Sequence, residues 1–158
     1  MNVSEKEFEQ IVREHKSTIY TVCYMFADNA DEVADLFQEA LVNIWNGLRK
    51  FDGRSGMRTW IYRVTLNTCI SADRKRKAVR NKQTPDNDLF NDSGGDNSQI
   101  EMLHKRITRL QPFDRAIVLL WLEDMSYEEI GNVVGISAKN VSVRLVRIRE
   151  KLKGMSDN

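Results

Sequence analysis

Basic and small polar side chains gather near the C-terminal end of the chain, on a segment whose apolar residues have helical spacing. Val141, Leu145, Ile148 and Leu152 recur at intervals of three and four, which predicts a helix over 138–152 with one buried face. The outward positions are Lys139, Asn140, Ser142, Val143, Arg144, Val146, Arg147, Arg149 and Lys151. Arginine can donate two hydrogen bonds to guanine or clamp a phosphate, and small side chains let a helix enter a major groove. The pattern favours a helix that contacts DNA.

The residues before this helix have the arrangement that a helix-turn-helix requires. Ser126-Tyr127-Glu128-Glu129 is a capping box, in which the Ser hydroxyl and the last Glu carboxylate bond free amides at a helix start. A short helix follows, then the tight turn Gly135-Ile136-Ser137, in which Ser137 caps the last helix. A short helix, a glycine turn and a basic second helix predict a helix-turn-helix. The alternative is an ordinary amphipathic hairpin whose basic face is merely solvated.

A second basic zone, residues 51–82, has a net charge of +7. It begins with a glycine-rich loop at 51–57 and continues as a helix that ends in the basic run at 74–77. Basic side chains attract phosphates, and exposed aromatic rings can stack on unpaired bases. By its spacing Trp60 belongs to the core, whereas Tyr62 lies off the apolar face and is the better stacking candidate. The alternative for Tyr62 is an ordinary surface residue.

The predicted helix after Asp28-Asn29-Ala30 has the opposite charge on its outer face. The polar residues of this face are Asp31, Glu32, Asp35, Gln38, Glu39 and Asn43. An acidic, amide-rich face repels DNA. It either binds a basic protein surface or is simply solvated, and composition leaves both interpretations open.

Taken together, these elements predict an all-α protein of two small helical domains. We expect a helical bundle at 1–80, a flexible acidic linker at 81–97 and a helix-turn-helix domain at 98–158. The linker is rich in Asn, Asp, Gly and Ser, and such a stretch cannot bury enough apolar surface to offset its ordering entropy. The net charge of the whole chain is only +1, because acidic and basic zones alternate along it and nearly cancel. The two basic zones suggest two contacts with a polyanion.

Several classes of protein are disfavoured. No stretch approaches the roughly 18 apolar residues of a membrane span, and the N-terminal residues lack a signal-peptide pattern, so we expect a cytoplasmic protein without membrane insertion. Cys23 and Cys69 lack metal-site spacing and are expected to be reduced, packed thiols. His15 and His104 stand alone, and no phosphate-binding loop is present. We therefore expect no enzyme activity, cofactor or metal. The closer rival is a stand-alone helix-turn-helix regulator with a sensory bundle.

Three regions of the sequence resemble bacterial sigma factors of the extracytoplasmic-function group. Asp35-Leu36-Phe37-Gln38-Glu39-Ala40-Leu41 followed by Ile44-Trp45 resembles their polymerase-binding segment. Thr59-Trp60-Ile61-Tyr62-Arg63-Val64 with Asn67 is similar to the adjoining helix that meets the minus-ten promoter element. Leu110-Gln111-Pro112-Phe113, Ser126-Tyr127-Glu128-Glu129-Ile130-Gly131 and Gly135-Ile136-Ser137 resemble the domain that contacts the minus-thirty-five element.

The resemblance implies a protein that binds core RNA polymerase, directs it to promoter DNA and promotes DNA melting. The implied polymerase contacts are Asp35, Gln38, Glu39 and Trp45. Along the minus-ten element it implies Asp52, Arg54, Arg58, Tyr62 and Asn67. In the minus-thirty-five groove, base edges would be faced by Ser142, Val143, Val146 and Arg147, and phosphates would be held by Lys139, Asn140 and Arg144.

One departure from the family affects the expected base preference. Val143 stands where the family often has a Ser, which removes a hydroxyl from the helix face that contacts bases. The resemblance also implies a further partner, because family members are often held inactive by a membrane-linked anti-sigma protein.

Overall fold

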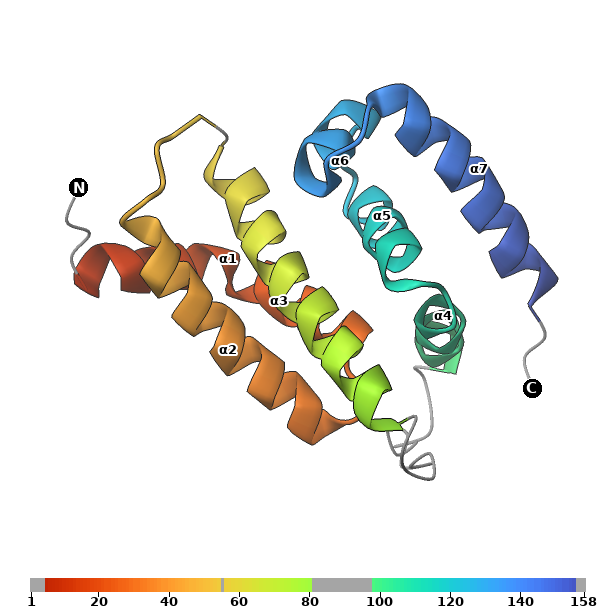
Figure 1. Ribbon diagram of the computed structural model, residues 1–158, viewed down its shortest axis with the longest axis horizontal. Helices are drawn as coiled ribbons and strands as arrows, with labels where there is room; N and C mark the ends of the chain where they lie inside the picture. The colour runs from red at the N-terminus through yellow and green to blue at the C-terminus, as the bar shows by residue number, and fades with distance from the viewer. Residues whose placement is uncertain (1–4, 55, 81–97, 156–158) are drawn as a thin grey trace. The chain divides into compact units, whose positions relative to one another are not determined.

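The computed structural model describes residues 5–54, 56–80 and 98–155 (Figure 1). Within these ranges the chain forms seven α-helices and no β-strand, so the predicted all-α class is confirmed. Among the helices described, none combines the length and the apolar character that crossing a membrane requires.

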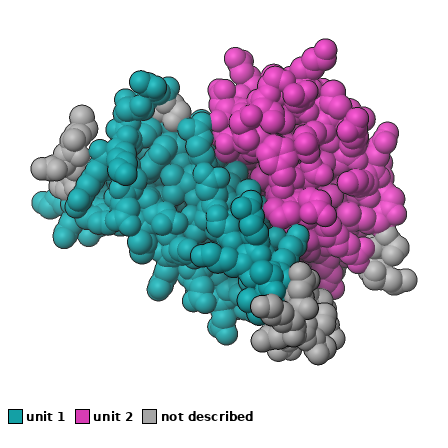
Figure 2. All heavy atoms as spheres, viewed as in Figure 1, with its two compact units in different colours: residues 1–90 teal, residues 91–158 magenta. Residues whose placement is uncertain are grey.

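Two compact units make up the chain, Met1–Phe90 and Asn91–Asn158 (Figure 2). Both contain fully buried aliphatic residues, such as Ile44 in the first unit and Ile130 in the second. The flexible linker predicted at 81–97 lies outside the described residues. We call the two parts unit 1 and unit 2 and describe each by itself.

Unit 1 is a bundle of α1 (Glu5–Phe26), α2 (Ala30–Leu48) and α3 (Met57–Arg80), in which each helix packs against the other two. Its core includes residues that the apolar spacing predicts, and fully buried examples are Ile19, Val22, Cys23, Ala40, Ile44 and Ile61. Burying one large aliphatic side chain contributes about 1.5–3 kcal/mol. Packing of these stripes, more than intrinsic helix propensity, therefore stabilises the bundle.

A reciprocal cap closes the turn between α1 and α2. The Asn29 side chain accepts a hydrogen bond from the Glu32 backbone N–H at 2.9 Å, and the Glu32 carboxylate accepts one from the Asp28 backbone N–H at 2.6 Å. The Asn29 side chain thus satisfies one of the amides that the start of α2 leaves without a helical partner. The sequence break expected at this point becomes a tight, capped corner.

Arg76 of α3 ties the end of the bundle to this corner. Its guanidinium forms an ion pair with Glu32 and donates a hydrogen bond to the Phe26 carbonyl oxygen. Asp73, one turn earlier on α3, lies 3.4 Å from the same guanidinium. The expectation that the whole basic run at 74–77 faces nucleic acid was therefore wrong for Arg76. Its charge is used inside unit 1, because three helices bring their polar ends together there.

Replacing Arg76 with Ala should lower the thermal midpoint of unit 1 by about 10 °C. Breaking a fully buried pair costs about 3–5 kcal/mol, and the 21% exposure of this guanidinium reduces the expected cost to about 2 kcal/mol. Lys75→Ala, at a neighbouring exposed position, is the matched control and should leave the midpoint unchanged. Thermal unfolding followed by circular dichroism makes the measurement. Equal midpoints for the two variants would contradict the structural role of Arg76.

Aromatic side chains anchor both ends of the loop between α2 and α3. A Cβ atom at Gly47 would lie 2.8 Å from the Trp60 ring, so the glycine lets α3 approach the end of α2 closely. The Phe51 ring, at the start of the loop, packs on Trp60 with 5.2 Å between ring centroids. Trp60 therefore belongs to the packing of unit 1, as its spacing predicts, and it holds the loop in place.

Unit 2 contains α4 (Ser98–Thr108), α5 (Pro112–Leu122), α6 (Tyr127–Val134) and α7 (Ala138–Gly154). α5 is its central helix, because it packs against the other three. Residues Ala116–Leu120 of α5 are all buried, which fits a helix that is apolar on every side over this stretch.

Arg115 is a buried charged residue of α5 that its sequence surroundings do not single out. Its guanidinium donates hydrogen bonds to the carbonyl oxygens of Thr108, at 2.7 Å, and Leu110, at 3.0 Å. These oxygens belong to the end of α4 and the turn after it, where carbonyl groups lack helical donors. The buried guanidinium therefore caps α4 and connects it to α5.

The turn between α6 and α7 is shaped by two glycines. Gly135 has φ 87°, in the left-handed region that favours glycine, and its N–H donates to the Gly131 carbonyl oxygen at 2.8 Å. A Cβ atom at Gly131 would lie 2.4 Å from the Ile136 carbonyl oxygen, so α6 and the turn touch backbone to backbone. The Ser137 hydroxyl then accepts a hydrogen bond from the Asn140 N–H at 3.1 Å and starts α7. The predicted helix-turn-helix is confirmed.

Candidate functional site

The outer face of α7 exposes most of the residues predicted to contact duplex DNA. Val141, Leu145 and Ile148 are buried against unit 2 and fix which side of the helix faces outward. The exposed members of the predicted set are Lys139, Asn140, Val143, Arg144, Val146 and Arg147, and Ser142 is half-buried. The helix therefore presents a continuous surface of basic, amide and small apolar side chains.

This face borders a groove of about 560 Å³ within unit 2. Its lining residues come from α7, the preceding turn and the start of α5, and they are Asp114, Ile136, Asn140, Val143, Arg144, Arg147 and Lys151. Arg144 is held in it by an ion pair with Asp114 at 3.1 Å, and its guanidinium stacks over the Phe113 ring at 4.7 Å. Neither contact is predictable from local sequence patterns, because α5 and α7 are far apart in the chain. The anchored guanidinium has fewer orientations to lose when it meets an anion.

The loop between α2 and α3 is ordered by its own side chains in the part that the structure describes. Asp52 accepts a hydrogen bond from the Arg54 backbone N–H at 3.0 Å and forms an ion pair with the Arg54 side chain at 3.1 Å. Gly53, between them, has φ 79°. Both charged side chains remain exposed, so they are accessible to a ligand. Ser55 lies outside the described residues.

Along α3, the predicted minus-ten residues differ in exposure. Arg58 and Asn67 are exposed, and the Arg58 guanidinium lies 5.7 Å from the centre of the Tyr62 ring. Tyr62 itself is fully buried, so the expectation that it lies on the surface was wrong. Leu66 and Cys69, which follow it at helical spacing, are buried too, so α3 buries a wider stripe than Trp60 and Ile61 alone indicate.

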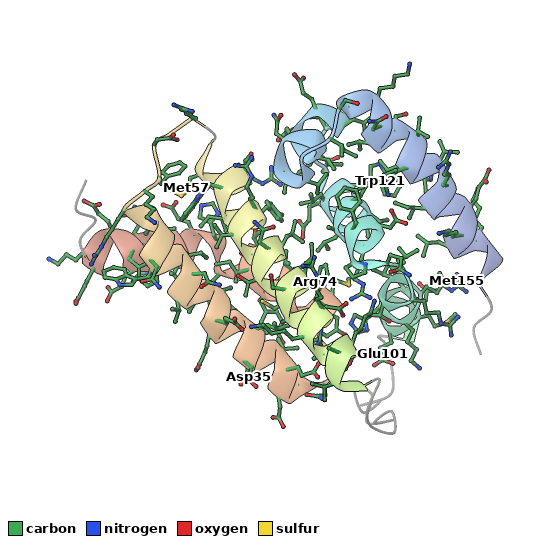
Figure 3. All side chains as sticks on the ribbon, viewed as in Figure 1. Asp35, Met57, Arg74, Glu101, Trp121 and Met155 are labelled. Carbon is green, nitrogen blue, oxygen red and sulfur yellow. The ribbon has the colours of Figure 1, made fainter. Side chains whose placement is uncertain are left out.

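The outer face of α2 keeps three of the four predicted polymerase contacts exposed. These are Asp35, Gln38 and Glu39, and Asp35 lies on the outer side of the helix (Figure 3). The fourth, Trp45, is half-buried and packs edge-on against Phe8 of α1 at 5.0 Å. Two other polar residues of this helix are engaged inside unit 1, Glu32 with Arg76 and Asn43 with Thr68.

The two cysteines are packed inside unit 1 as free thiols, as expected. The Cys69 thiol donates a hydrogen bond to Cys23, with 4.0 Å between the sulfur atoms. This hydrogen bond and burial raise the pKa of the Cys69 thiol well above its ordinary value. A protonated, buried thiol is a poor nucleophile and a poor metal ligand. Within the described ranges no cluster of His, Cys, Asp and Glu could hold a metal ion.

One unit carries a helix-turn-helix with an exposed basic second helix, and the other is a helical bundle with an acidic face; these are features of a DNA-binding protein that acts in transcription. Comparison with known families agrees. The protein-family model described as Sigma-70 region 2 matches residues 11–79, and the family model described as Sigma-70, region 4 matches residues 100–152. The chain therefore belongs to the sigma-70 family, whose members direct RNA polymerase to promoters.

Within that family, the chain is an extracytoplasmic-function sigma factor. It is 26% identical to the ECF RNA polymerase sigma factor SigE of Mycolicibacterium smegmatis, with 92% of this chain and 60% of that protein covered. The chain thus spans about three fifths of that relative's length. It is 27% identical to ECF RNA polymerase sigma factor SigW of Bacillus subtilis, with 92% and 87% covered.

A solved structure of a sigma factor has a similar fold. The chain resembles the sigma factor RpoE from Bartonella quintana, solved in complex with the anti-sigma factor NepR, with a TM-score of 0.75 and 20% identity. The match covers 94% of this chain and 95% of that one. At this identity the likeness concerns the fold.

Proposed function

We propose that the chain divides promoter recognition between two domains, 1–80 and 98–158. The first binds core RNA polymerase and the minus-ten element, and the second binds the minus-thirty-five element. The observation that carries this division is the pair of opposite surfaces on separate units: the acidic face of α2 and the basic face of α7. The order of the two family matches along the chain supports the same assignment.

On α7, we assign base contacts and phosphate contacts to different residues. Base edges are assigned to Val143, Val146 and Arg147, which are exposed on the outward side of the recognition helix, and to the half-buried Ser142 at the margin of that side. Lys139, Asn140 and Arg144 hold phosphates, and the anchoring of Arg144 by Asp114 supports a positioning contact of this kind. Phosphate contacts set the register of the helix on the duplex, and base contacts supply sequence preference.

In unit 1, we assign polymerase binding to Asp35, Gln38, Glu39 and Trp45. The exposed carboxylates of α2 suit a basic protein surface, and the half-buried Trp45 offers an aromatic edge beside them. The minus-ten residues Asp52, Arg54, Arg58 and Asn67 are all exposed, which suits contact with a nucleic acid. Tyr62 could contact DNA only after a rearrangement that uncovers its ring, since it is buried here.

Strand opening is assigned to the loop at 51–57. We expect Arg54→Ala to form the initial closed complex normally but to lower promoter opening about tenfold, as loss of one base contact or stacking interaction does. Permanganate footprinting measures opening, because it modifies unpaired thymines. Lys50→Ala, an exposed basic residue just before the loop, is the control for a general loss of charge. Normal opening by the Arg54 variant would remove this loop from the melting step.

Run-off transcription tests the proposed function as a whole. Core RNA polymerase is supplied with promoter templates, with and without this chain. We expect a discrete transcript only when the chain is present. Tight, sequence-specific duplex binding by the chain alone, without any stimulation of polymerase, would instead favour a stand-alone helix-turn-helix regulator.

We also propose that the chain works in the cytoplasm and is restrained there by an anti-sigma protein. The support is the solved neighbour, which binds an anti-sigma factor, together with the cytoplasmic site of transcription in bacteria. We expect a partner protein that blocks run-off transcription to co-purify with the chain. We expect this partner to be lost from the purified complex once the cells receive the inducing signal.

A further inference from the structure

The outermost part of α7 carries two apolar side chains where a DNA-binding helix usually presents polar ones. Val143 is 43% exposed and Val146 is 56% exposed. At 3.6 residues per turn, Val143 points almost directly away from the buried residues Val141, Leu145 and Ile148, and Val146 lies beside it. We call Val143 and Val146 the apolar contact surface of α7.

The chemistry of base-pair edges restricts what this surface can recognise. In the major groove, the apolar group that distinguishes one base from the others is the 5-methyl group of thymine. Valine neither donates nor accepts a hydrogen bond, so it gains nothing from the amino, carbonyl and ring-nitrogen groups of the other bases. Its branched side chain also keeps essentially one χ1 rotamer in a helix, which holds its methyl groups at a fixed place.

The surroundings of the surface favour DNA over an apolar partner protein. Val143 lines the same groove as Asn140, Arg147 and Lys151, so polar and cationic groups flank it on one side. A protein partner that covers an apolar pair would have to desolvate these charges. A DNA duplex instead offers phosphates and guanine acceptors to the charges and thymine methyl groups to the valines.

We propose that Val143 and Val146 select thymine by contact with its 5-methyl group. The inference rests on the proposed function, and it adds a base preference at the minus-thirty-five element. It predicts that duplexes bound by the holoenzyme, which is core polymerase with this chain, carry thymine at one or two fixed positions in that element.

The experiment begins with holoenzyme and a pool of randomised duplexes, from which bound sequences are selected. Each thymine of the selected upstream element is then replaced by deoxyuridine, which removes only the methyl group. At one or two positions we expect about fourfold weaker binding, which corresponds to about 0.8 kcal/mol for one buried methylene-sized group. At the other thymines the replacement should have no effect.

Variants connect the effect to the valines. In Val143→Ser or Val146→Ser holoenzyme, the thymine and uracil duplexes should bind equally at the matching position, with circular dichroism unchanged because both side chains are exposed. Val79→Ser, a 53% exposed valine of α3, is the matched control and should keep the fourfold difference.

The outcomes separate the two proposals. Selected duplexes that bind equally well with uracil at every position would overturn the thymine contact and leave the sigma-factor function intact. Persistence of the fourfold difference in both Ser variants would likewise overturn the thymine contact alone. Failure of the holoenzyme to enrich any sequence would overturn the proposed function together with this inference.

Discussion

Reversing two charges on α2, Asp35→Lys with Glu39→Lys, should abolish association of the chain with core RNA polymerase. Both carboxylates are exposed and lie one turn apart, so the double variant places two positive charges on the face assigned to the polymerase. Like charges facing each other in an interface cost several kcal/mol, which corresponds to a loss of affinity of more than about a hundredfold. The fold should persist, because the ion pairs at the end of unit 1 use Glu32 and Asp73 instead.

Co-purification with core polymerase is the measurement, and a second double reversal is the control. Glu9→Lys with Glu14→Lys changes the net charge by the same amount on exposed positions of α1. We expect the control to associate normally and both variants to give the circular dichroism spectrum of the parent chain. If the α2 variant co-purified at the parent's yield, the polymerase contact would have to be sought elsewhere on the chain.

Gly131→Ala should disrupt the helix-turn-helix more than substitution of Gly135 or Gly154, the other glycines that the structure describes in unit 2. The added methyl group would lie 2.4 Å from the Ile136 carbonyl oxygen, which is backbone and cannot rotate away. The same turn is closed by N–H groups of Gly135 and Ile136, which donate to the Gly131 carbonyl oxygen at 2.8 and 3.2 Å. Relief of the clash must move the turn away from α6, at a cost of about 3 kcal/mol, the upper end of what overpacking usually costs.

Two other glycines provide graded controls for this variant. Gly135→Ala places a side chain at φ 87° and should cost about 1–2 kcal/mol, because only the left-handed backbone is strained. Gly154→Ala has open space around the new methyl group and should be neutral or slightly stabilising. Thermal unfolding and binding of a minus-thirty-five duplex by holoenzyme should rank the variants in the same order. A Gly131 variant as stable as the Gly154 variant would contradict the close backbone contact.

Local patterns in the sequence predict most of the helices, because the information for them is local. The Ser126 hydroxyl and the Glu129 carboxylate form the reciprocal cap that their spacing indicates. Apolar spacing likewise places Val141, Leu145 and Ile148 inward, which leaves the remaining positions of α7 outward. The candidate DNA surface of unit 2 could therefore be outlined from the sequence alone.

Contacts between distant segments could not be predicted in this way. Nothing in the run around Arg76 indicates that this one residue meets Glu32, since the pairing depends on where α1, α2 and α3 converge. The hold of Asp114 on Arg144 depends in the same way on the packing of α5 beside α7. Apolar spacing along a helix indicates only one buried direction, whereas α3 packs against two helices. The spacing therefore predicts an outward Tyr62, although its side chain is buried.

The hydrogen-bonded thiols of Cys23 and Cys69 allow the unfolding of unit 1 to be measured by thiol labelling. They are the chain's two cysteines, both are fully buried, and the raised pKa keeps the Cys69 sulfur out of its reactive thiolate form. A maleimide dye can therefore label the native chain only when the bundle opens, so its rate of alkylation follows the opening of unit 1 and is blind to unit 2. A cysteine introduced at an exposed position of α7 would then be labelled selectively by a fluorophore in the native chain. That fluorophore could report DNA contact by unit 2, while the cysteines of unit 1 stay unlabelled.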